Sequence, residues 1–320
     1  MNVPPKKYIL VQEERLLAFV TTCFEKAGLE VSHARLISRL LVNNDLRGVR
    51  SHGTHIAHSY CMDFVNGNLN PRPNVRTLKE SGASTVIDGD GTLGYLPMVQ
   101  AAESAVLHAK EYNVGLALVP HIGHYGSAGH YTRICAESGC IGFSAQSGRN
   151  ESRGNPPICF AIPGGNEPDM VLDGGSDLFG PYQGPEYEDL YTRIPSVFFK
   201  NLGFMAVSSL IGGGLTGFSL PEGDAIQERW PSARLGGIVL AINIEAAVPG
   251  EIFRAEVDRY TRELRAICEP IPGTDRLLLP GHIEEERTAL HRREGIRFGE
   301  QEQQAMTALH EYFDVALPWD

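Results

Sequence analysis

The chain has 320 residues and a net charge of −11, and 42% of its residues are hydrophobic. This length predicts roughly two domains. The acidic balance argues against a nucleic-acid partner, which would require a basic face. No apolar run approaches the ~18 residues that a membrane span needs, and the N-terminus lacks the apolar run of a signal peptide. We therefore expect a globular protein with no nucleic-acid partner and no membrane segment.

The six cysteines are scattered along the chain without a CxxC pair. Most of them lie among apolar residues, as buried free thiols do. A chain of this length does not need disulfides to stabilise its core. Together these features predict a reducing compartment, and we expect a cytoplasmic protein.

The first 74 residues are expected to form a helical unit. Apolar side chains of residues 11–27 fall on one helical face, and Gly28 ends that helix. Ser32 is placed to cap a second helix that ends near Gly48. A third helix is expected between Ser51 or Thr54 and Gly67, after which two prolines close the unit.

The pattern then changes to alternating strands and helices, which is typical of a mixed α/β layer. Strands are predicted at 84–88, 115–119, 140–145, 158–162, 170–172 and 236–244. Helices are predicted at 97–112 and 127–138, followed by a buried helix at 200–211, with loops at 174–196 and 218–235.

After Pro249 helical patterns return at 250–267, 284–294 and 300–314. The order of helical, α/β and helical segments suggests that the two chain ends pack together. We predict a helical domain made of residues 1–74 and 248–320 and a central α/β domain made of residues 75–247.

The sequence GGGLTG at 212–217 satisfies the dinucleotide pattern G-x-G-x-x-G. A true fingerprint follows a strand and opens a helix, whereas this one follows a helix and opens none. We interpret it as a helix end or a close-packing turn. No Walker A sequence or G-x-S-x-G elbow is present.

Histidines gather in two stretches, DLRGVRSHGTHIAHSY at 45–60 and HIGHYGSAGH at 121–130. Such clusters can hold a metal ion. No carboxylate or cysteine stands at a convincing ligand spacing, however, so we predict no metal site. Packing or surface positions are expected for His55, His58, His108, His282 and His291.

Two histidines differ from the rest because each lies beside glycine at the start of a predicted helix. These are His52 in SHG and His124 in GHYG. Glycine lets a ligand approach the backbone closely, and a helix N-terminus favours a neutral imidazole. This environment suits proton transfer near neutral pH. His52 and His124 are therefore the first catalytic candidates.

Several segments occur in an order that resembles a known family. They are DLRGVRSHG, VGLALVPHIGHYGSAGHYTRICAESGCIGFSAQSG, NPPICFAIPGG, MVLDGGS and LLLPGH. The chain resembles the malate/L-lactate dehydrogenase family of NAD(P)-dependent oxidoreductases. The resemblance implies a non-Rossmann fold, a homodimer, and an active site near the domain junction. It also implies hydride transfer between NAD or NADP and a small carbonyl, hydroxy or imine compound, with a histidine moving the proton.

The resemblance also assigns site residues. It implies catalytic roles for His52, His124 and Asp173. It implies cofactor contacts for His124, Asp173, Ser176, Phe199, Lys200, Gly281 and His282. Arg47, Arg50 and Ser51, close to His52, are candidates for substrate binding.

The chain departs from the family pattern at two places. Ile56 stands where the family usually has an arginine that is suited to gripping a carboxylate. Residues 174–200 are acidic and loop-like where a basic helix is usual. These departures leave two alternatives open: a non-redox proton transfer or elimination that uses His52 and His124, and a binding protein on a decayed scaffold.

Overall fold

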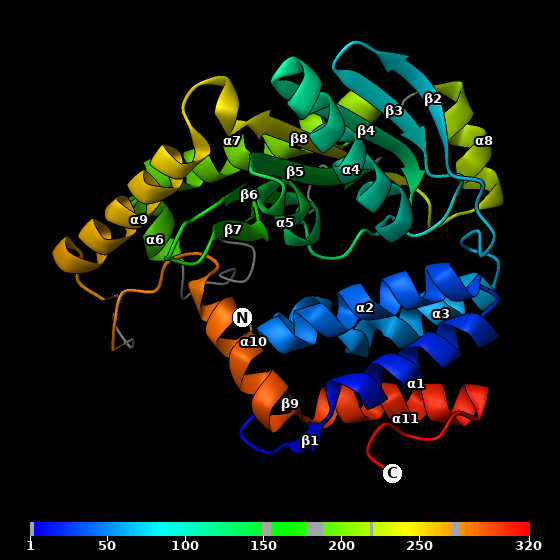
Figure 1. Ribbon diagram of the computed structural model, residues 1–320. Helices are drawn as coiled ribbons and strands as arrows, with labels where there is room; N and C mark the ends of the chain where they lie inside the picture. Colours follow the sequence, from blue (N-terminus) through cyan, green and yellow to red (C-terminus); the bar gives the residue numbers. More distant parts are fainter. Residues whose placement is uncertain (1–2, 149–154, 178–187, 218–219, 271–274) are drawn as a thin grey trace.

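The fold was analysed in a computed structural model, which describes residues 3–148, 155–177, 188–217, 220–270 and 275–320. A helical part contains the first and last segments of the chain, which lie together below a sheet-containing α/β part in Figure 1. Two separate clusters of buried hydrophobic residues match these parts, one among the terminal helices and one around the sheet.

Segments from both ends of the chain build the helical part. From the N-terminal side come β1 (Ile9–Val11), α1 (Glu13–Lys26), α2 (Val31–Arg47), two 3₁₀ turns (Arg50–His52 and Thr54–Ile56) and α3 (Ala57–Val65). From the C-terminal side come α10 (His282–Glu294), β9 (Ile296–Phe298) and α11 (Glu300–Phe313). β1 pairs antiparallel with β9, so a short two-stranded ribbon joins the two ends of the chain.

Within the described residues, seven strands form one mixed sheet in the order β2-β3-β4-β8-β5-β6-β7. The strands are β2 (Arg76–Ser81), β3 (Ser84–Asp88), β4 (Val114–Ile122), β5 (Cys140–Gly148), β6 (Pro157–Ile162), β7 (Met170–Gly175) and β8 (Leu235–Asn243). Among these described pairs only β3 and β4 run parallel, which differs from the all-parallel doubly wound sheet. This arrangement confirms the predicted mixed-sheet α/β fold.

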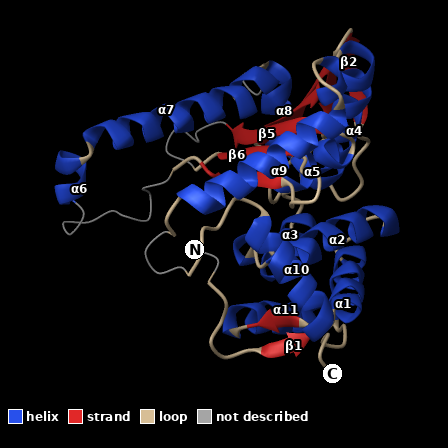
Figure 2. Cartoon of the chain, turned by 60° about the vertical axis from the view of Figure 1, so that its left-hand side comes forward, coloured by secondary structure: helices blue, strands red, loops and turns tan. Residues whose placement is uncertain are grey.

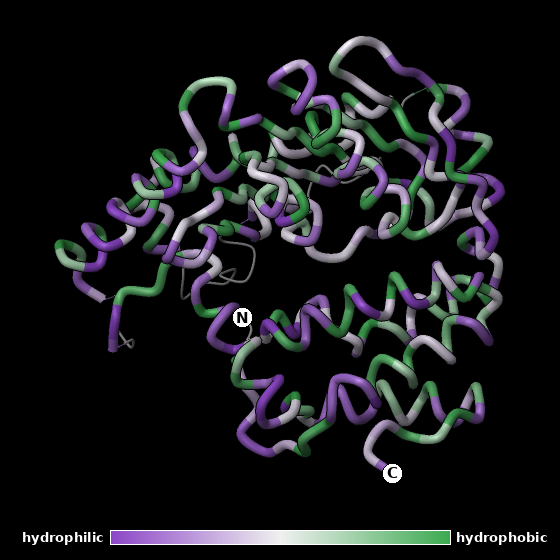
Figure 3. Tube along the Cα trace, in the orientation of Figure 1, coloured by the Kyte–Doolittle hydropathy of each residue, from purple (hydrophilic) through white to green (hydrophobic). Residues whose placement is uncertain are grey.

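Helices pack on this sheet. α4 (Tyr95–Tyr112) contacts β4 and β8, α5 (Gly129–Glu137) contacts β5, and α7 (Pro195–Gly212) contacts β5. The remaining helices are α6 (Glu188–Arg193), α8 (Pro221–Arg229) and α9 (Gly250–Ile267). The central strands are largely hydrophobic and α10 is largely hydrophilic, as Figure 3 shows. This contrast fits a buried sheet and a helix at the surface.

The segments that the sequence did not predict are short or exposed. β2 is exposed at every position, so it carries no alternating apolar pattern. β1 and β9 have three residues each, too few for a periodic signal. α6 and α8 lie in segments that were predicted as loops. The start of α8 nonetheless had a signal in the sequence, because a proline opens the helix and Glu222 and Asp224 lie in its first turn.

The prediction of a buried helix at 200–211 is wrong about burial. The helix exists as α7, but its buried residues are small or polar: Asn201, Ser208 and Gly212. By length and composition alone, the segment Pro195–Thr216 could cross a membrane, and only 22% of its apolar window is buried. This finding also corrects the expectation that no apolar run approaches that length. Figure 2 shows α7 running along the outside of the molecule, with α6 at its end.

α9 was grouped with the terminal helices, but it is tied to a loop of the α/β part. The Asp258 carboxylate accepts hydrogen bonds from the backbone N–H groups of Gly165, Asn166 and Glu167 at 2.7–3.1 Å. We therefore propose that the C-terminal share of the helical domain begins after α9.

The GGGLTG segment has the structural role that was predicted for it. Residues 214–216 form a single 3₁₀ turn after α7, and a Cβ on Gly212 would come within 2.8 Å of the Gln146 backbone. The glycine therefore permits close packing of α7 on β5.

Candidate active site

The loop that carries His52 follows the C-terminal end of α2. Gly48 ends that helix in the left-handed conformation, with φ at +71°. The Asn44 side-chain amide then donates to the His52 backbone carbonyl at 2.8 Å. The Asp45 carboxylate accepts from the Thr54 backbone N–H at 2.9 Å. The last turn of α2 thus holds the backbone on both sides of His52.

Gly53 is required by close packing rather than by its backbone angles. Its φ of −81° suits any residue. A Cβ at this position would lie 1.8 Å from Asp45 Oδ1, which is an impossible contact. The glycine therefore lets the chain pass against the Asp45 carboxylate that anchors Thr54. Burial raises the pKa of that carboxyl to about 7, although the hydrogen bonds from Thr54 oppose the shift.

His124 follows β4 and is held by the sheet. The Gln146 side chain from β5 donates to the Gly123 carbonyl at 3.1 Å and accepts from the Tyr125 N–H at 3.2 Å. The Gly94 N–H donates to the His124 carbonyl at 3.0 Å. Buried hydrogen bonds of this kind fix the backbone on both sides of the imidazole.

The hydrogen bonds of His124 define its protonation. Its Nδ1 accepts from the Gly126 N–H at 3.3 Å and lies 2.5 Å from the Tyr60 hydroxyl. Burial raises the pKa of Tyr60, so that hydroxyl keeps its proton and can donate. Burial also lowers the pKa of His124 to about 4. The ring is therefore neutral near pH 7 with its proton on Nε2, which suits a hydrogen-bond donor better than an acid.

His52 lies against His124 in a different electrostatic setting. The two rings stack with centroids 5.5 Å apart and an interplanar angle of 24°. Ser51 Oγ lies 2.9 Å from His52 Nδ1. Burial lowers the pKa of His52, and the negative charge of Asp173 opposes that shift. Of the two rings, His52 alone has a carboxylate that favours its protonated form, so it is the better proton carrier.

Asp173 on β7 is tied to the start of α5. Its Oδ2 accepts from Ser127 Oγ at 2.5 Å and from the Gly129 N–H at 2.7 Å. A carboxylate in this place caps the helix and is favoured by its dipole. Asp173 thus has a structural role in addition to its electrostatic effect on His52.

Two cavities meet at His124. One, which we call the Tyr60 cavity, has a volume of about 500 Å³ and is also lined by Arg234. The other, which we call the Asp173 cavity, has a volume of about 430 Å³ and is lined by Ser51, His52, Arg133 and Asp173. His124, Asn155 and Pro157 line both cavities. Their combined volume is within the range of small-molecule and cofactor sites.

The structure brings four predicted residues to this junction: Ser51, His52, His124 and Asp173. Arg47 and Gly281 line a third cavity of about 450 Å³. Arg133 lines both this cavity and the Asp173 cavity. Arg47 is therefore near the site but outside the two cavities that share His124.

The other predicted residues lie elsewhere. Arg50 forms an ion pair with Glu302 in the helical part. The Ser176 hydroxyl donates to the Pro156 carbonyl at 2.7 Å, and His282 Nδ1 lies 2.6 Å from an Arg265 nitrogen. Phe199 and Lys200 are on the exposed face of α7. None of these five side chains lines either of the cavities that share His124.

Ile56 also lies away from the cavities. It packs against the hydrophobic core of the helical part and lines neither cavity at His124. The position that the resemblance associates with a carboxylate-gripping arginine is thus occupied by a core side chain.

Several cavity residues were not predicted, among them Tyr60, Asn155 and Arg133. Asn155 begins the NPP segment, whose Asn-Pro pair was a visible signal for an extended backbone at a site. Tyr60 and Arg133 gave no such signal, because each sits at an ordinary helical position. Among the residues that the structure describes, no three His, Cys, Asp or Glu side chains gather closely enough to hold a metal ion.

Comparison with known proteins identifies the family. The model of the malate/L-lactate dehydrogenase family matches residues 11–176, just over half of the chain. The chain belongs to this family. The matched region contains His52, His124 and Asp173, together with β4, which precedes His124, and β7, which carries Asp173.

Named relatives of the family are dehydrogenases. A malate dehydrogenase of Pyrococcus horikoshii is 32% identical over 177 residues, a match that covers 52% of this chain but only 49% of that protein. An L-sulfolactate dehydrogenase of Methanocaldococcus jannaschii is 27% identical over 327 residues, covering 90% of this chain and 92% of that protein. These relatives support an oxidoreductase.

A solved structure of a family member has the same fold. The malate dehydrogenase of Entamoeba histolytica superimposes with a TM-score of 0.80 over 98% of this chain and 100% of that one, at 21% identity. This likeness agrees with the mixed sheet described above.

Proposed function

We propose that the protein is an NAD(P)-dependent oxidoreductase that acts on a small carbonyl, hydroxy or imine compound. The observation that carries this proposal is the pair of stacked histidines at the junction of two cavities, with Asp173 close to one ring. Membership of a family whose named members are dehydrogenases supports it. Some relatives act on acids and a solved neighbour is a piperideine-2-carboxylate reductase, so both C=O and C=N substrates are in scope.

The histidines divide the proton chemistry between them. Nε2–H of neutral His124 donates a hydrogen bond to the substrate heteroatom and polarises the bond to its carbon. His52 gives the proton to that heteroatom in the reducing direction and removes it in the oxidising direction. Asp173 stabilises the imidazolium that His52 becomes in the oxidising direction.

The residues present fit a nicotinamide dinucleotide. When bound, the nicotinamide supplies or accepts the hydride. The Asp173 cavity offers the glycine backbone of Gly174 and Gly175, which a ligand can approach closely. Arg133 also lines this cavity, where its charge suits a phosphate oxygen. We propose that these residues hold NAD or NADP.

A charged group on the substrate would be bound by residues other than the arginine that is usual in the family. Ile56 cannot hold a carboxylate, and it points into the helical core. Among the residues that the structure describes, the arginines that line the two cavities at His124 are Arg133 and Arg234. If the substrate is an acid, we propose that one of these two arginines binds its carboxylate.

Nucleotide binding is the direct test of this function. We expect either NADH or NADPH to raise the melting temperature and to give a saturable heat signal by isothermal titration. At 100 times its Kd a ligand adds roughly 2.7 kcal/mol of stability, an effect that a thermal-shift assay resolves. ADP-ribose serves as a control that lacks the nicotinamide ring. Absence of binding by both nucleotides, together with turnover in their absence, would instead support the non-redox alternative.

We also propose that two copies of the chain associate through α7. Large apolar side chains on this helix are 41–77% exposed: Val197, Phe199, Leu202, Phe204, Val207 and Leu210. Lys200 is the only charged residue of α7. Covering this face would bury several hundred Å² on each subunit, which approaches the ~800 Å² per partner of a stable interface. A helix already packed on β5 cannot span a bilayer, so a second copy is the favoured occupant.

The oligomeric state tests this interface. We expect analytical ultracentrifugation to show a dimer for the wild type and a monomer for Leu210→Glu, because the charge would be buried between copies. Leu107→Glu is the matched control, since Leu107 on α4 is 71% exposed and Leu210 is 67% exposed. A monomeric wild type, or flotation of the protein with lipid vesicles, would contradict the proposal.

A further inference from the structure

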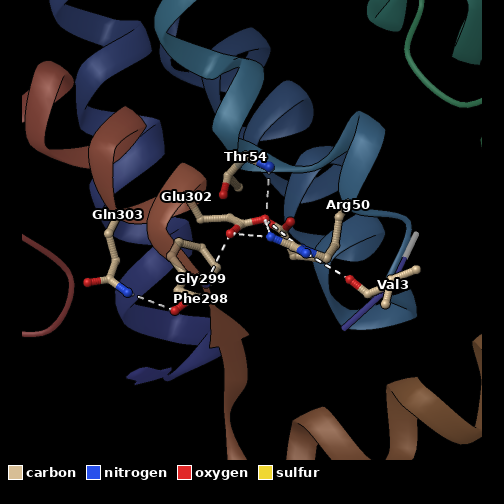
Figure 4. Close-up of polar contacts among 8 residues, drawn as sticks. Val3, Arg50, Thr54, Phe298, Gly299, Glu302 and Gln303 are labelled. Carbon is tan, nitrogen blue, oxygen red and sulfur yellow. Dashed lines mark hydrogen bonds and ion pairs between the residues drawn. The ribbon is translucent and has the colours of Figure 1, made fainter. Parts of the chain in front are cut away.

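Arg50, two residues before His52, binds a carboxylate on the C-terminal helix. Its Nε donates to Glu302 Oε1 at 2.7 Å and its Nη2 donates to Glu302 Oε2 at 2.6 Å. Its Nη1 donates to the Val3 carbonyl at 2.8 Å. Figure 4 shows Arg50 and Glu302 facing each other end to end, with Thr54 and Gly299 nearby. A two-point pair of this kind fixes orientation as well as distance.

Glu302 is itself held in place. Its side chain is 2% exposed. Its Oε2 also accepts from the Gly299 N–H at 3.0 Å, at the start of α11. The carboxylate therefore joins the first turn of α11 to the loop that carries His52, across 250 residues of sequence.

The loop has little structure of its own to hold His52. Residues 50–52 and 54–56 form two single 3₁₀ turns separated by Gly53. Such short turns are weak, so the position of the ring depends on contacts from outside the loop. These contacts are Arg50 with Glu302 at one end, Asn44 with the His52 carbonyl, and Thr54 with Asp45 at the other end.

The Arg50–Glu302 pair lies away from the reacting groups. Arg50, Glu302 and Asp45 line a separate cavity of about 120 Å³ within the helical part. A role in substrate binding, which the sequence had suggested for Arg50, requires a side chain in one of the cavities at His124. Arg50 lines neither of them. Nor is a buried ion pair needed for stability, because apolar side chains often replace one without loss.

We propose that Glu302, acting through Arg50, is a positioning residue that holds the His52 ring against His124. The inference rests on the proposed function only in that His52 moves a proton. Helix α11, near the C-terminus, thereby influences turnover at a site that other elements build. Loss of the pair leaves the cavities intact and lets the His52 ring leave its stacked position.

A double variant separates positioning from stability. Arg50→Met with Glu302→Leu replaces the pair by apolar side chains and leaves no unpaired charge. We expect it to fold with a melting temperature close to that of the wild type and to lose roughly 10- to 100-fold in kcat, because small misplacements of a reacting group are costly. The KM values should change by less than about twofold, since the binding surfaces are untouched. Should this variant not fold, Arg50→Lys keeps the charge but not the two-point contact, and about a 10-fold loss in kcat is expected.

The His52 ring is observed directly by NMR of protein labelled with ¹⁵N-histidine, with His52→Gln used for assignment. In the variants we expect the ring signals to shift and the His52 pKa to move upward toward its ordinary value, because the released ring is better solvated. Glu286→Gln is the control, because it removes only the exposed pair with Arg276. It should change neither kcat nor the ring signals.

Each result decides the question. A folded double variant with wild-type kcat and unchanged His52 signals overturns the proposal. The proposal is also overturned if Arg50→Lys lowers the melting temperature but changes neither kcat nor the His52 signals. The ring signals are recorded without substrate or nucleotide. They therefore test positioning even if the wild type binds no nicotinamide, an outcome that would refute the proposed function alone.

Discussion

Replacing His52 with glutamine is expected to lower turnover by about 10²-fold or more while the protein stays folded and still binds nicotinamide nucleotide. Glutamine retains hydrogen-bonding capacity but cannot carry a proton at neutral pH. In the reducing direction the wild-type rate should fall as pH rises through the pKa of His52, because the imidazolium loses its proton. That limb of the pH–rate profile should be missing in His52→Gln. Steady-state kinetics between pH 5 and 9 measures both effects.

A paired substitution at His124 separates the two histidines. His124→Asn keeps an acceptor near the Tyr60 hydroxyl and the Gly126 N–H but removes the Nε2–H donor. We expect a comparable loss of turnover. The fall in rate as pH rises through the pKa of His52 should remain. His58→Gln, in the same histidine-rich stretch as His52 but outside both cavities, is the control and should behave as wild type. Wild-type turnover in His52→Gln would refute the assignment of the proton to this ring.

Gly53→Ala is expected to have the second large effect. The added Cβ would meet Asp45 Oδ1 at 1.8 Å and Asp45 Cγ at 2.8 Å, so the carboxylate must move away from the Thr54 N–H. Overpacking and a lost buried hydrogen bond together should lower the free energy of unfolding by about 3 kcal/mol. Turnover should fall by roughly 10²-fold, because the neighbouring His52 is displaced. Chemical denaturation and steady-state assays test these two expectations.

A matched glycine and a double variant control this experiment. Gly214→Ala adds a Cβ that meets only the Leu210 side chain at 3.7 Å and should be nearly silent. Adding Asp45→Ser to Gly53→Ala removes the clash, so the two losses should be clearly less than additive. Strict additivity would show that the Asp45 contact is not the reason for glycine at this position.

The sequence was sufficient for the order of segments and for the two central histidines. Hydrophobic periodicity located most helices and strands, and glycine beside His52 and His124 marked places where backbone or ligand approaches closely. It could not rank the arginines. Arg47, Arg50 and Arg133 carry the same charge, and only the folded chain determines that Arg50 binds Glu302 whereas Arg133 lines a cavity.

The same limit explains the error at α7. The segment is apolar, and apolar helices are usually buried, so the sequence predicted a core helix. In the fold its small and polar residues Asn201, Ser208 and Gly212 face inward and its large ones face outward. Periodicity identifies a helix but does not say which side meets the rest of the molecule when most sides are apolar.

By itself the sequence determined the family, the mixed α/β class and the candidacy of His52 and His124, because these depend on local patterns that survive without neighbours. Tertiary structure alone decided how the site is assembled. It brings His52 from the helical part against His124 from the sheet, buries His124 so that it stays neutral, and places Asp173 near His52. These properties depend on burial and on contacts between residues far apart in sequence, and no local stretch encodes them. The Arg50–Glu302 pair, whose residues are 252 positions apart, shows the same dependence.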